Sequence, residues 1–268
     1  MTLLEVSDLT VAFGDHIVVD HVSFMIDPGE RLAIIGESGS GKTLTALSVI
    51  GLAPETASIS GSIHFEGQEL LGRRDRDLSK VRGEDIAMVF QNPLTSLNPL
   101  MRVGKQVAEP LRRHHGRSRR DARTMAIELC ARVGLPEPDR IVRSYPHQLS
   151  GGQRQRIGMA IALACRPALL IADEPTTALD VTVQAEVLAA LAELVLSEQT
   201  ALLFITHDVA LVPVVADELL VMRNGVIVES GDVATVLDDP QHAYTRQLLA
   251  AAEKTALAPR AQRELADG

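Results

Sequence analysis

An eight-residue run, GESGSGKT over residues 36–43, matches the pattern G-x-x-x-x-G-K-[ST] of a phosphate-binding loop. It follows the short apolar run 31–35 and precedes residues 42–52, which have helical character. Such a loop works between a strand and a helix, because its glycines turn backbone N–H groups inward and the helix end adds unpaired donors and a positive dipole. The run therefore predicts a buried strand, a tight loop and a helix, and without those flanks it is only a turn that caps a helix.

The loop carries two side chains with separate tasks. We expect the Lys42 ammonium to reach the β- and γ-phosphates of a nucleotide, and the Thr43 hydroxyl to bind Mg²⁺. The predicted phosphate-binding residues are Gly36, Glu37, Ser38, Gly39, Ser40, Gly41, Lys42 and Thr43.

Two adjacent carboxylates, Asp173 and Glu174, follow the apolar run 169–172. The carboxyl ends of parallel strands form the crevice in which such sheets bind ligands. We expect Asp173 to hold Mg²⁺ through water and Glu174 to polarise an attacking water as general base. Taken alone, the pair also fits a strand end with solvated acids, and the phosphate-binding loop is what favours the catalytic interpretation.

The rest of the chain divides into three stretches. Residues 3–35 are typical of strands, and residues 92–158 are mostly helical in pattern. Residues 168–222 alternate between strand and helix, with one helix expected to start at Val209. Strands that alternate with helices of this length imply crossovers and a parallel sheet. Asn224 and Gly225 predict a tight hairpin turn.

Composition narrows the function classes. The chain has 268 residues, 46% of them hydrophobic, and a formal net charge of −9, which excludes a mainly disordered chain and weighs against a nucleic-acid binder. The two cysteines, Cys130 and Cys165, are far apart in sequence, so we expect two small core residues rather than a disulfide or a Cys-rich metal site. We also expect no secretion signal at the N-terminus and no membrane-spanning helix.

The order of several motifs resembles the nucleotide-binding subunit of ABC transporters, over residues 3–252. These motifs are the phosphate-binding loop, Gln91, Leu149–Gln153, Asp173–Glu174, Ala178–Asp180 and His207. The resemblance implies a P-loop NTPase (RecA-like) α/β core with a parallel sheet, an N-terminal antiparallel β subdomain and an inserted helical subdomain at about 92–158. It implies one ATPase domain over 1–252, a short tail over 253–268, and ATP and Mg²⁺ as ligands.

The resemblance also implies roles for single residues. Gln91 would sense Mg²⁺ and the attacking water, His207 would touch the γ-phosphate, and Asp180 would lie at a subunit contact. Phe13 matches the ring that stacks on adenine, where the family more often has Tyr. A signature segment would bind the γ-phosphate of ATP held by the opposite subunit, and its residues are Ser150, Gly151, Gly152 and Gln153.

Narrower motifs are similar to those of peptide and nickel import ATPases. They are residues 91–99, 145–148 and 242–249, and the short tail resembles nickel or metallophore importers, so both solutes stay open. The implied partners are a second ATPase subunit (identical or different), two membrane permease subunits and an extracytoplasmic binding protein, with the chain peripheral on the cytoplasmic face of the membrane. An exporter, or an ATPase of DNA repair or translation, fits these motifs less well.

One basic stretch has no role in that scheme. Six arginines between residues 112 and 123 surround His114 and His115. The stretch is either a solvated edge of the helical insertion or a surface for phosphates or lipid headgroups. A metal site at the histidine pair lacks a third ligand in the sequence.

Overall fold

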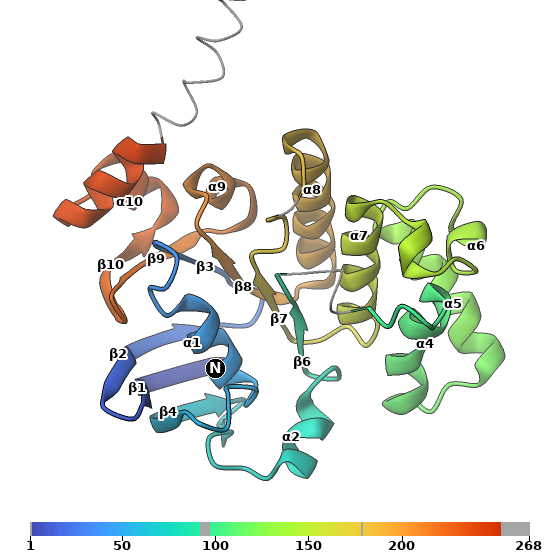
Figure 1. Cartoon of the computed structure of the whole chain (residues 1–268), viewed down its shortest axis with the longest axis horizontal. Coiled ribbons are helices and arrows are strands. Elements are labelled where there is room, and N and C mark those ends of the chain that lie inside the picture. Colours follow the sequence, from blue (N-terminus) through green and yellow to red (C-terminus); the bar gives the residue numbers. More distant parts are fainter. Residues whose placement is uncertain (1, 92–96, 178, 253–268) are drawn as a thin grey trace, which may run out of the picture.

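A computed structural model describes residues 2–91, 97–177 and 179–252 of the chain. Residues 92–96 of the predicted importer motif, Ala178 and the predicted tail 253–268 lie outside the described residues. Figure 1 shows a central sheet with α1 and the N-terminal strands toward one end of the molecule and α4 to α7 gathered at another.

The central sheet has six strands in the order β10-β9-β3-β8-β7-β6. Each pair of adjacent strands in this sheet is parallel, except that β10 pairs antiparallel with β9. The phosphate-binding loop follows β3, which lies between β9 and β8. The strand bounds are β3 (Arg31–Ile35), β6 (Ile86–Val89), β7 (Leu169–Asp173), β8 (Ala201–Thr206), β9 (Glu218–Arg223) and β10 (Val226–Asp232).

Alternate residues of these strands enter two different hydrophobic cores. Along β3, Leu32 and Ile34 belong to one core, whereas Ala33 and Ile35 belong to the other. Successive side chains of a strand point to opposite faces, so an apolar run without polar alternation buries both. The apolar sequences of β3, β7 and β8 therefore place these strands inside the molecule, with only their ends open to ligands.

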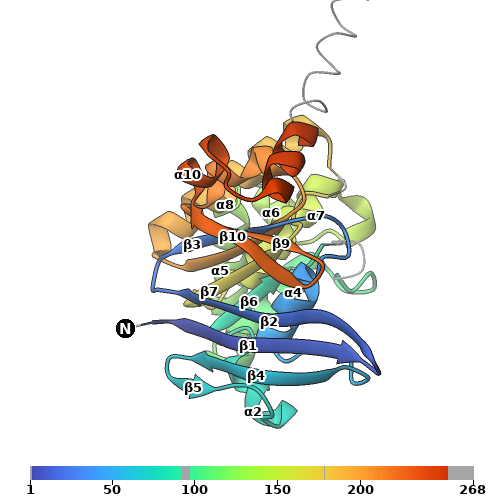
Figure 2. The ribbon, with the colours of Figure 1, turned by 90° about the vertical axis from the view of Figure 1, so that its left-hand side faces the viewer.

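An antiparallel sheet covers one side of the central sheet, with α1 between them in the same core. Its strands are ordered β2-β1-β4-β5, and Figure 2 shows them stacked on the side opposite α8 and α10. The elements on this side are β1 (Leu4–Phe13), β2 (His16–Ile26), α1 (Lys42–Val49), β4 (Ser58–Phe65), β5 (Gln68–Glu69) and α2 (Asp75–Val81).

The core on the other face of the central sheet is formed largely by helices, including those of the helical insertion. Between Leu97 and β7 the described chain holds helices and turns without a strand. The insertion holds α4 (Val103–Arg113), α5 (Arg119–Arg132), α6 (Pro138–Ile141), η1 (Pro146–Gln148) and α7 (Gly151–Ala162). The later helices are α8 (Val181–Glu198), η2 (Val209–Leu211), α9 (Val212–Val215) and α10 (Val233–Asp238), and residues 243–252 are also helical.

The predicted α/β fold with its parallel core, antiparallel sheet and helical insertion is confirmed. The hairpin at Asn224 and Gly225 is also confirmed, with both residues at positive φ. Among the described residues, no helix is both long and apolar enough for a membrane span.

Two predicted helices differ in extent from those observed. The helix expected over 42–52 ends at Val49, because Gly51 turns the chain at φ 62°. The helix expected to start at Val209 is a short 3₁₀ turn, followed by the four residues of α9. Pro213 is the reason, since it has no N–H to donate to an upstream carbonyl and so begins a new helix.

Two glycines of α7 offer a test of the contact between α7 and α8. A Cβ at Gly152 would lie 2.4 Å from Val183 Cγ1, whereas a Cβ at Gly158 would meet nothing within 4 Å. We expect Gly152→Ala to lower the free energy of unfolding by about 1–3 kcal/mol through overpacking. Gly158→Ala should raise it by up to about 1 kcal/mol through helix propensity. Urea unfolding measures both, and equal midpoints would contradict this contact.

A candidate nucleotide site at the carboxyl ends of the central strands

The phosphate-binding loop closes around the Lys42 side chain. Its ammonium donates to the carbonyl oxygens of Gly36 and Glu37, both at 2.8 Å, and the residue is only 4% exposed. Burial lowers the pKa of Lys42, and the carboxylates of Glu174 and Asp173 oppose that shift. The loop therefore holds a desolvated positive charge beside two acids.

Atoms of Met222 leave no room for a side chain at two glycines of this loop. A Cβ at Gly36 would lie 2.1 Å from the carbonyl oxygen of Met222, and one at Gly41 would lie 2.8 Å from Met222 Cε. Gly225 N also donates to Ser40 O at 3.1 Å. Any residue with a side chain at Gly36 or Gly41 would push the loop away from the β9–β10 hairpin.

Tyr244 is a support that sequence analysis missed as part of the site. Its hydroxyl accepts a hydrogen bond from Glu37 N at 3.0 Å, and the residue is 2% exposed. The Arg223 guanidinium lies 4.7 Å from the ring centroid. Tyr244 belongs to the motif 242–249, which in the sequence indicated only a subfamily.

Thr43 and Asp173 bring two oxygen ligands together at the start of α1. Thr43 Oγ1 donates to Asp173 Oδ1 at 3.0 Å. Burial raises the pKa of Asp173 to about 6, although the Thr43 hydrogen bond acts in the opposite direction. A buried carboxylate with a raised pKa gains from a nearby cation, and hydroxyl and carboxylate oxygens are the ligands that Mg²⁺ prefers.

Glu174 is the centre of a second group of contacts. Its Oε2 accepts hydrogen bonds from Gln91 Nε2 at 2.8 Å and from Thr177 Oγ1 at 2.9 Å, and its Oε1 lies 3.1 Å from His207 Nδ1. Burial alone raises the pKa of Glu174, but the contacts from His207 and Thr177 outweigh it, so the pKa is lowered. Its backbone holds a left-handed conformation, with φ 44°, and its N–H donates to Ile205 O at 2.8 Å.

The predicted site residues thus fall into two groups. One group lies together at the carboxyl ends of β3, β7 and β8 and consists of residues 36–43, Gln91, Asp173, Glu174 and His207. The hydrogen bonds of the described chain join none of the signature residues 150–153 to this cluster, and Figure 1 places α7 well apart from α1.

The signature segment is built as a helix start. Ser150 Oγ accepts from Gln153 N at 3.3 Å, and Gln153 Oε1 accepts from Ser150 N at 3.0 Å. This reciprocal capping box leaves the remaining amides of the first turn available to an anion. Asp180 caps α8 in the same manner, with its side chain accepting from Val183 N at 3.0 Å.

Phe13 ends β1 and is half-buried. The neighbouring strand β2 reaches the loop through Val18, whose carbonyl oxygen would be 3.0 Å from a Cβ at Gly41. The adenine-stacking role of Phe13 stays a prediction.

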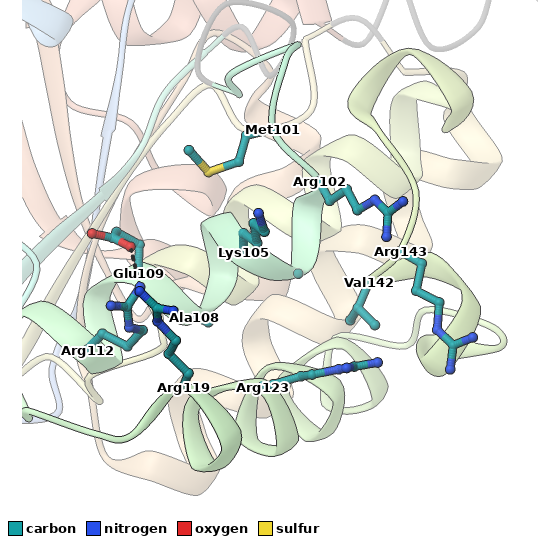
Figure 3. Close-up of a pocket in the computed structure, with 11 residues that line it drawn as sticks. Met101, Arg102, Lys105, Ala108, Glu109, Arg112, Arg119, Arg123, Val142 and Arg143 are labelled. Atoms are coloured by element: carbon teal, nitrogen blue, oxygen red, sulfur yellow. Dashed lines mark ion pairs between the residues drawn. The ribbon is translucent and has the colours of Figure 1, made fainter.

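A large hollow lies elsewhere, in the helical insertion. It has a volume of about 840 Å³, and Figure 3 shows it between α4, α5 and the residues after α6. Among the described residues that line it, Glu109 is the only acidic one, and it lies 3.6 Å from Arg112. The lining cations are Arg102, Lys105, Arg112, Arg119, Arg123 and Arg143. Part of the basic stretch found in the sequence thus joins other cations around one concave surface.

Comparison with curated proteins returns transporter ATP-binding proteins. The chain is 52% identical to the peptidoglycan transport ATP-binding protein YejF of Agrobacterium fabrum, over 94% of this chain but only 47% of that protein. It is 47% identical to the oligopeptide transport ATP-binding protein OppD of Bacillus subtilis, over 92% of this chain and 71% of OppD. It is 44% identical to the dipeptide transport ATP-binding protein DppD of Escherichia coli, over 94% and 78%. The chain therefore spans about half the length of the first of these relatives and over two thirds of the others.

Solved structures give the same family. The dimeric cassette MJ0796, in a post-hydrolysis state bound to ADP and Pi, matches with a TM-score of 0.75 and 28% identity over 86% of this chain and 98% of that one. CbiO1 from Clostridium perfringens, part of the ABC transporter complex cbiONQ, matches with a TM-score of 0.76 and 26% identity over 89% and 91%. The family model described as ABC transporter matches residues 19–177. The chain belongs to the ATP-binding family of ABC transporters.

Proposed function

We propose that this chain hydrolyses ATP to drive an ABC importer of peptides. The observation that carries the proposal is the Glu174 carboxylate, which three side chains hold beside the phosphate-binding loop and the Thr43–Asp173 pair. The transport names of the relatives support the coupling to uptake. We assign the ATPase domain to residues 1–252, with the helical subdomain inserted at about 92–158.

Nucleotide binding follows from the loop. The backbone amides of residues 36–43 and the end of α1 receive the phosphates, and Lys42 exchanges its loop carbonyls for phosphate oxygens. Thr43 and Asp173, with Gln91 near the γ-phosphate, are the residues that would hold Mg²⁺. When bound, Mg²⁺ neutralises charge on the β- and γ-phosphates.

Hydrolysis follows from the second group. A lowered pKa keeps Glu174 ionised at neutral pH, so it is available to accept a proton from water. Gln91 and His207, one contacting each carboxylate oxygen, orient the base and the water. Thr177 donates to the same carboxylate oxygen as Gln91 and so helps to fix the orientation of the base.

A second ATPase subunit completes the site. The signature segment 150–153 lies apart from the loop of its own chain, which supports a role in binding nucleotide held by another molecule. The dimeric state of MJ0796 supports such an assembly. We infer a head-to-tail pair with two ATP molecules between the subunits.

We infer that the solute is a peptide. The relatives are named for peptidoglycan, oligopeptide and dipeptide transport, and none of those three is named for nickel. The inferred partners are two permease subunits and an extracytoplasmic binding protein, with this chain on the cytoplasmic face of the cell membrane.

We assign the basic hollow to contact with a permease subunit. Six cationic side chains face one carboxylate there, although the chain as a whole carries a charge of −9. A partner segment that fits must be acidic, because uncompensated cations held this close repel one another. Leu100 precedes the lining residue Met101 in the chain and is 88% exposed, so it is available for an apolar contact.

Replacing the proposed base separates hydrolysis from binding. Glu174→Gln should lower the ATP turnover rate by about 10²–10⁴-fold while ATP affinity stays within a few-fold. An ATP-bound dimer should then accumulate, which light scattering on a sizing column detects. Glu193→Gln, an exposed acid on α8, is the control and should hydrolyse normally. Normal turnover in Glu174→Gln would remove this residue as the base.

The raised pKa of Asp173 predicts a pH dependence of Mg²⁺ binding. Asp173 is protonated below a pH of about 6 and then cannot bind the cation. Between about pH 7 and pH 5 the Mg²⁺ affinity of the wild type should fall by about tenfold relative to that of Asp173→Asn. Titration of the nucleotide's own phosphates affects both proteins equally, so the ratio isolates Asp173. A ratio that is constant over this range would contradict its role as a ligand.

Charge reversal tests the hollow. Arg119→Glu with Arg123→Glu reverses two lining charges, whereas Arg113→Glu with Arg120→Glu makes the same change on α4 and α5 outside the hollow. The first pair should weaken binding to permease-containing vesicles by at least about tenfold, and the second pair should not. Equal losses in both variants would indicate a nonspecific charge effect and overturn the assignment.

A further inference from the structure

Four potential metal ligands from three separate parts of the sequence lie close together at the amino ends of β6 and β7. Glu84 precedes β6, His114 and His115 follow α4, and Cys165 follows α7. One ligand atom each from Glu84, His115 and Cys165 lies within 4.8 Å of the other two. Leu169 N donates to Asp85 O at 3.1 Å, so the start of β7 pairs beside the loop that carries Glu84.

Glu84 is the centre of this cluster and is incompletely satisfied. Its Oε1 lies 3.0 Å from His115 Nε2, and its Oε2 lies 3.4 Å from His114 Nδ1. Oε2 is buried and forms no hydrogen bond. A buried carboxylate oxygen left in this state costs free energy unless a cation or donor reaches it.

Cys165 brings a sulfur to the same point. The residue is 6% exposed, and burial followed by the charge of Glu84 raises the pKa of its thiol to about 11. A carboxylate oxygen of Glu84 lies within 4.8 Å of the Cys165 sulfur. A divalent cation placed between the two groups would bind the thiolate and the carboxylate together.

We propose that Glu84, His115 and Cys165 bind Zn²⁺, with His114 as the positioning residue for Glu84. One thiolate, one imidazole and one carboxylate, with water in a fourth position, is a ligand set that suits zinc. Zinc ligands lie about 2.0–2.3 Å from the ion, so closing the group around it takes side-chain shifts of roughly 1 Å. Binding releases the Cys165 thiol proton to solvent.

This site is independent of the nucleotide site and of the proposed function. The phosphate-binding loop and Asp173 lie at the carboxyl ends of the strands, and Glu84 and Cys165 lie before the amino ends of β6 and β7. Sulfur also separates the two sites chemically, because Mg²⁺ takes oxygen ligands. In the part of the chain that the structure describes, this is the one group of His, Cys and acidic residues with such spacing.

The test uses the full chain without nucleotide, in a phosphine reductant. Equilibrium dialysis with Zn²⁺, read by mass spectrometry, should give one ion per chain. Substitution with Co²⁺ should produce the near-ultraviolet thiolate-to-metal absorption, which requires a sulfur ligand. Zn²⁺ should also raise the unfolding temperature.

Matched variants decide the outcome. Cys165→Ser and His115→Gln should each lower Zn²⁺ affinity by more than about 100-fold, and His114→Gln by about 10–100-fold, as for a residue that orients a ligand. Cys130→Ser removes the other buried cysteine and should bind like the wild type. A wild type without Zn²⁺, or a thiolate absorption that survives in Cys165→Ser, would overturn the site. Zinc retained by Cys165→Ser without that absorption would place the ion elsewhere, and this also overturns it.

Discussion

The burial of opposite charges at one edge of the central sheet is the interaction on which the site depends. Lys42 and Asp173 are 4% and 2% exposed, and each would be costly to bury alone. Their mutual attraction, with hydrogen bonds from the loop carbonyls and Thr43, offsets the loss of water. The same burial raises the pKa of Asp173 to about 6 and lowers that of Lys42. A bound phosphate would compensate the positive charge of Lys42, and a divalent cation would compensate the negative charge of Asp173.

Holding such a charge in place requires rigid backbone, and distant segments provide it. Met222 of the β9–β10 hairpin lies against the loop glycines. Gly225 of the same hairpin donates to the Ser40 carbonyl oxygen, and the Tyr244 hydroxyl accepts from the amide of Glu37. These residues follow the loop by about 180 positions or more, so the loop takes its shape only in the complete fold. Strain at Glu174, in the left-handed region, is maintained in the same way by its bond to Ile205.

The sequence predicted the parts of the site that are local. The loop pattern, the paired acids after an apolar strand and the alternation of strands and helices each report on neighbouring residues, and the fold they predict is confirmed. Gln91 and His207 were assigned to the site from the family resemblance rather than from spacing, and their contacts with Glu174 were not predicted. Tyr244 was missed because its contact depends on where the C-terminal helix packs.

The same dependence on tertiary packing explains why the sequence did not predict the cluster at the opposite edge of the sheet. His114 and His115 lacked a third ligand in the sequence, because Glu84 and Cys165 approach them only after β6 and β7 pair. Helix α7 links this cluster to the nucleotide chemistry, since it begins at the signature segment and Cys165 follows its end. Its twelve residues span about 18 Å as a stiff rod. A metal at Cys165 would therefore fix the base of the helix whose other end is proposed to meet ATP on the partner. The two proposals thus place nucleotide at the carboxyl ends of the strands and a structural metal ion at the amino ends of the same sheet.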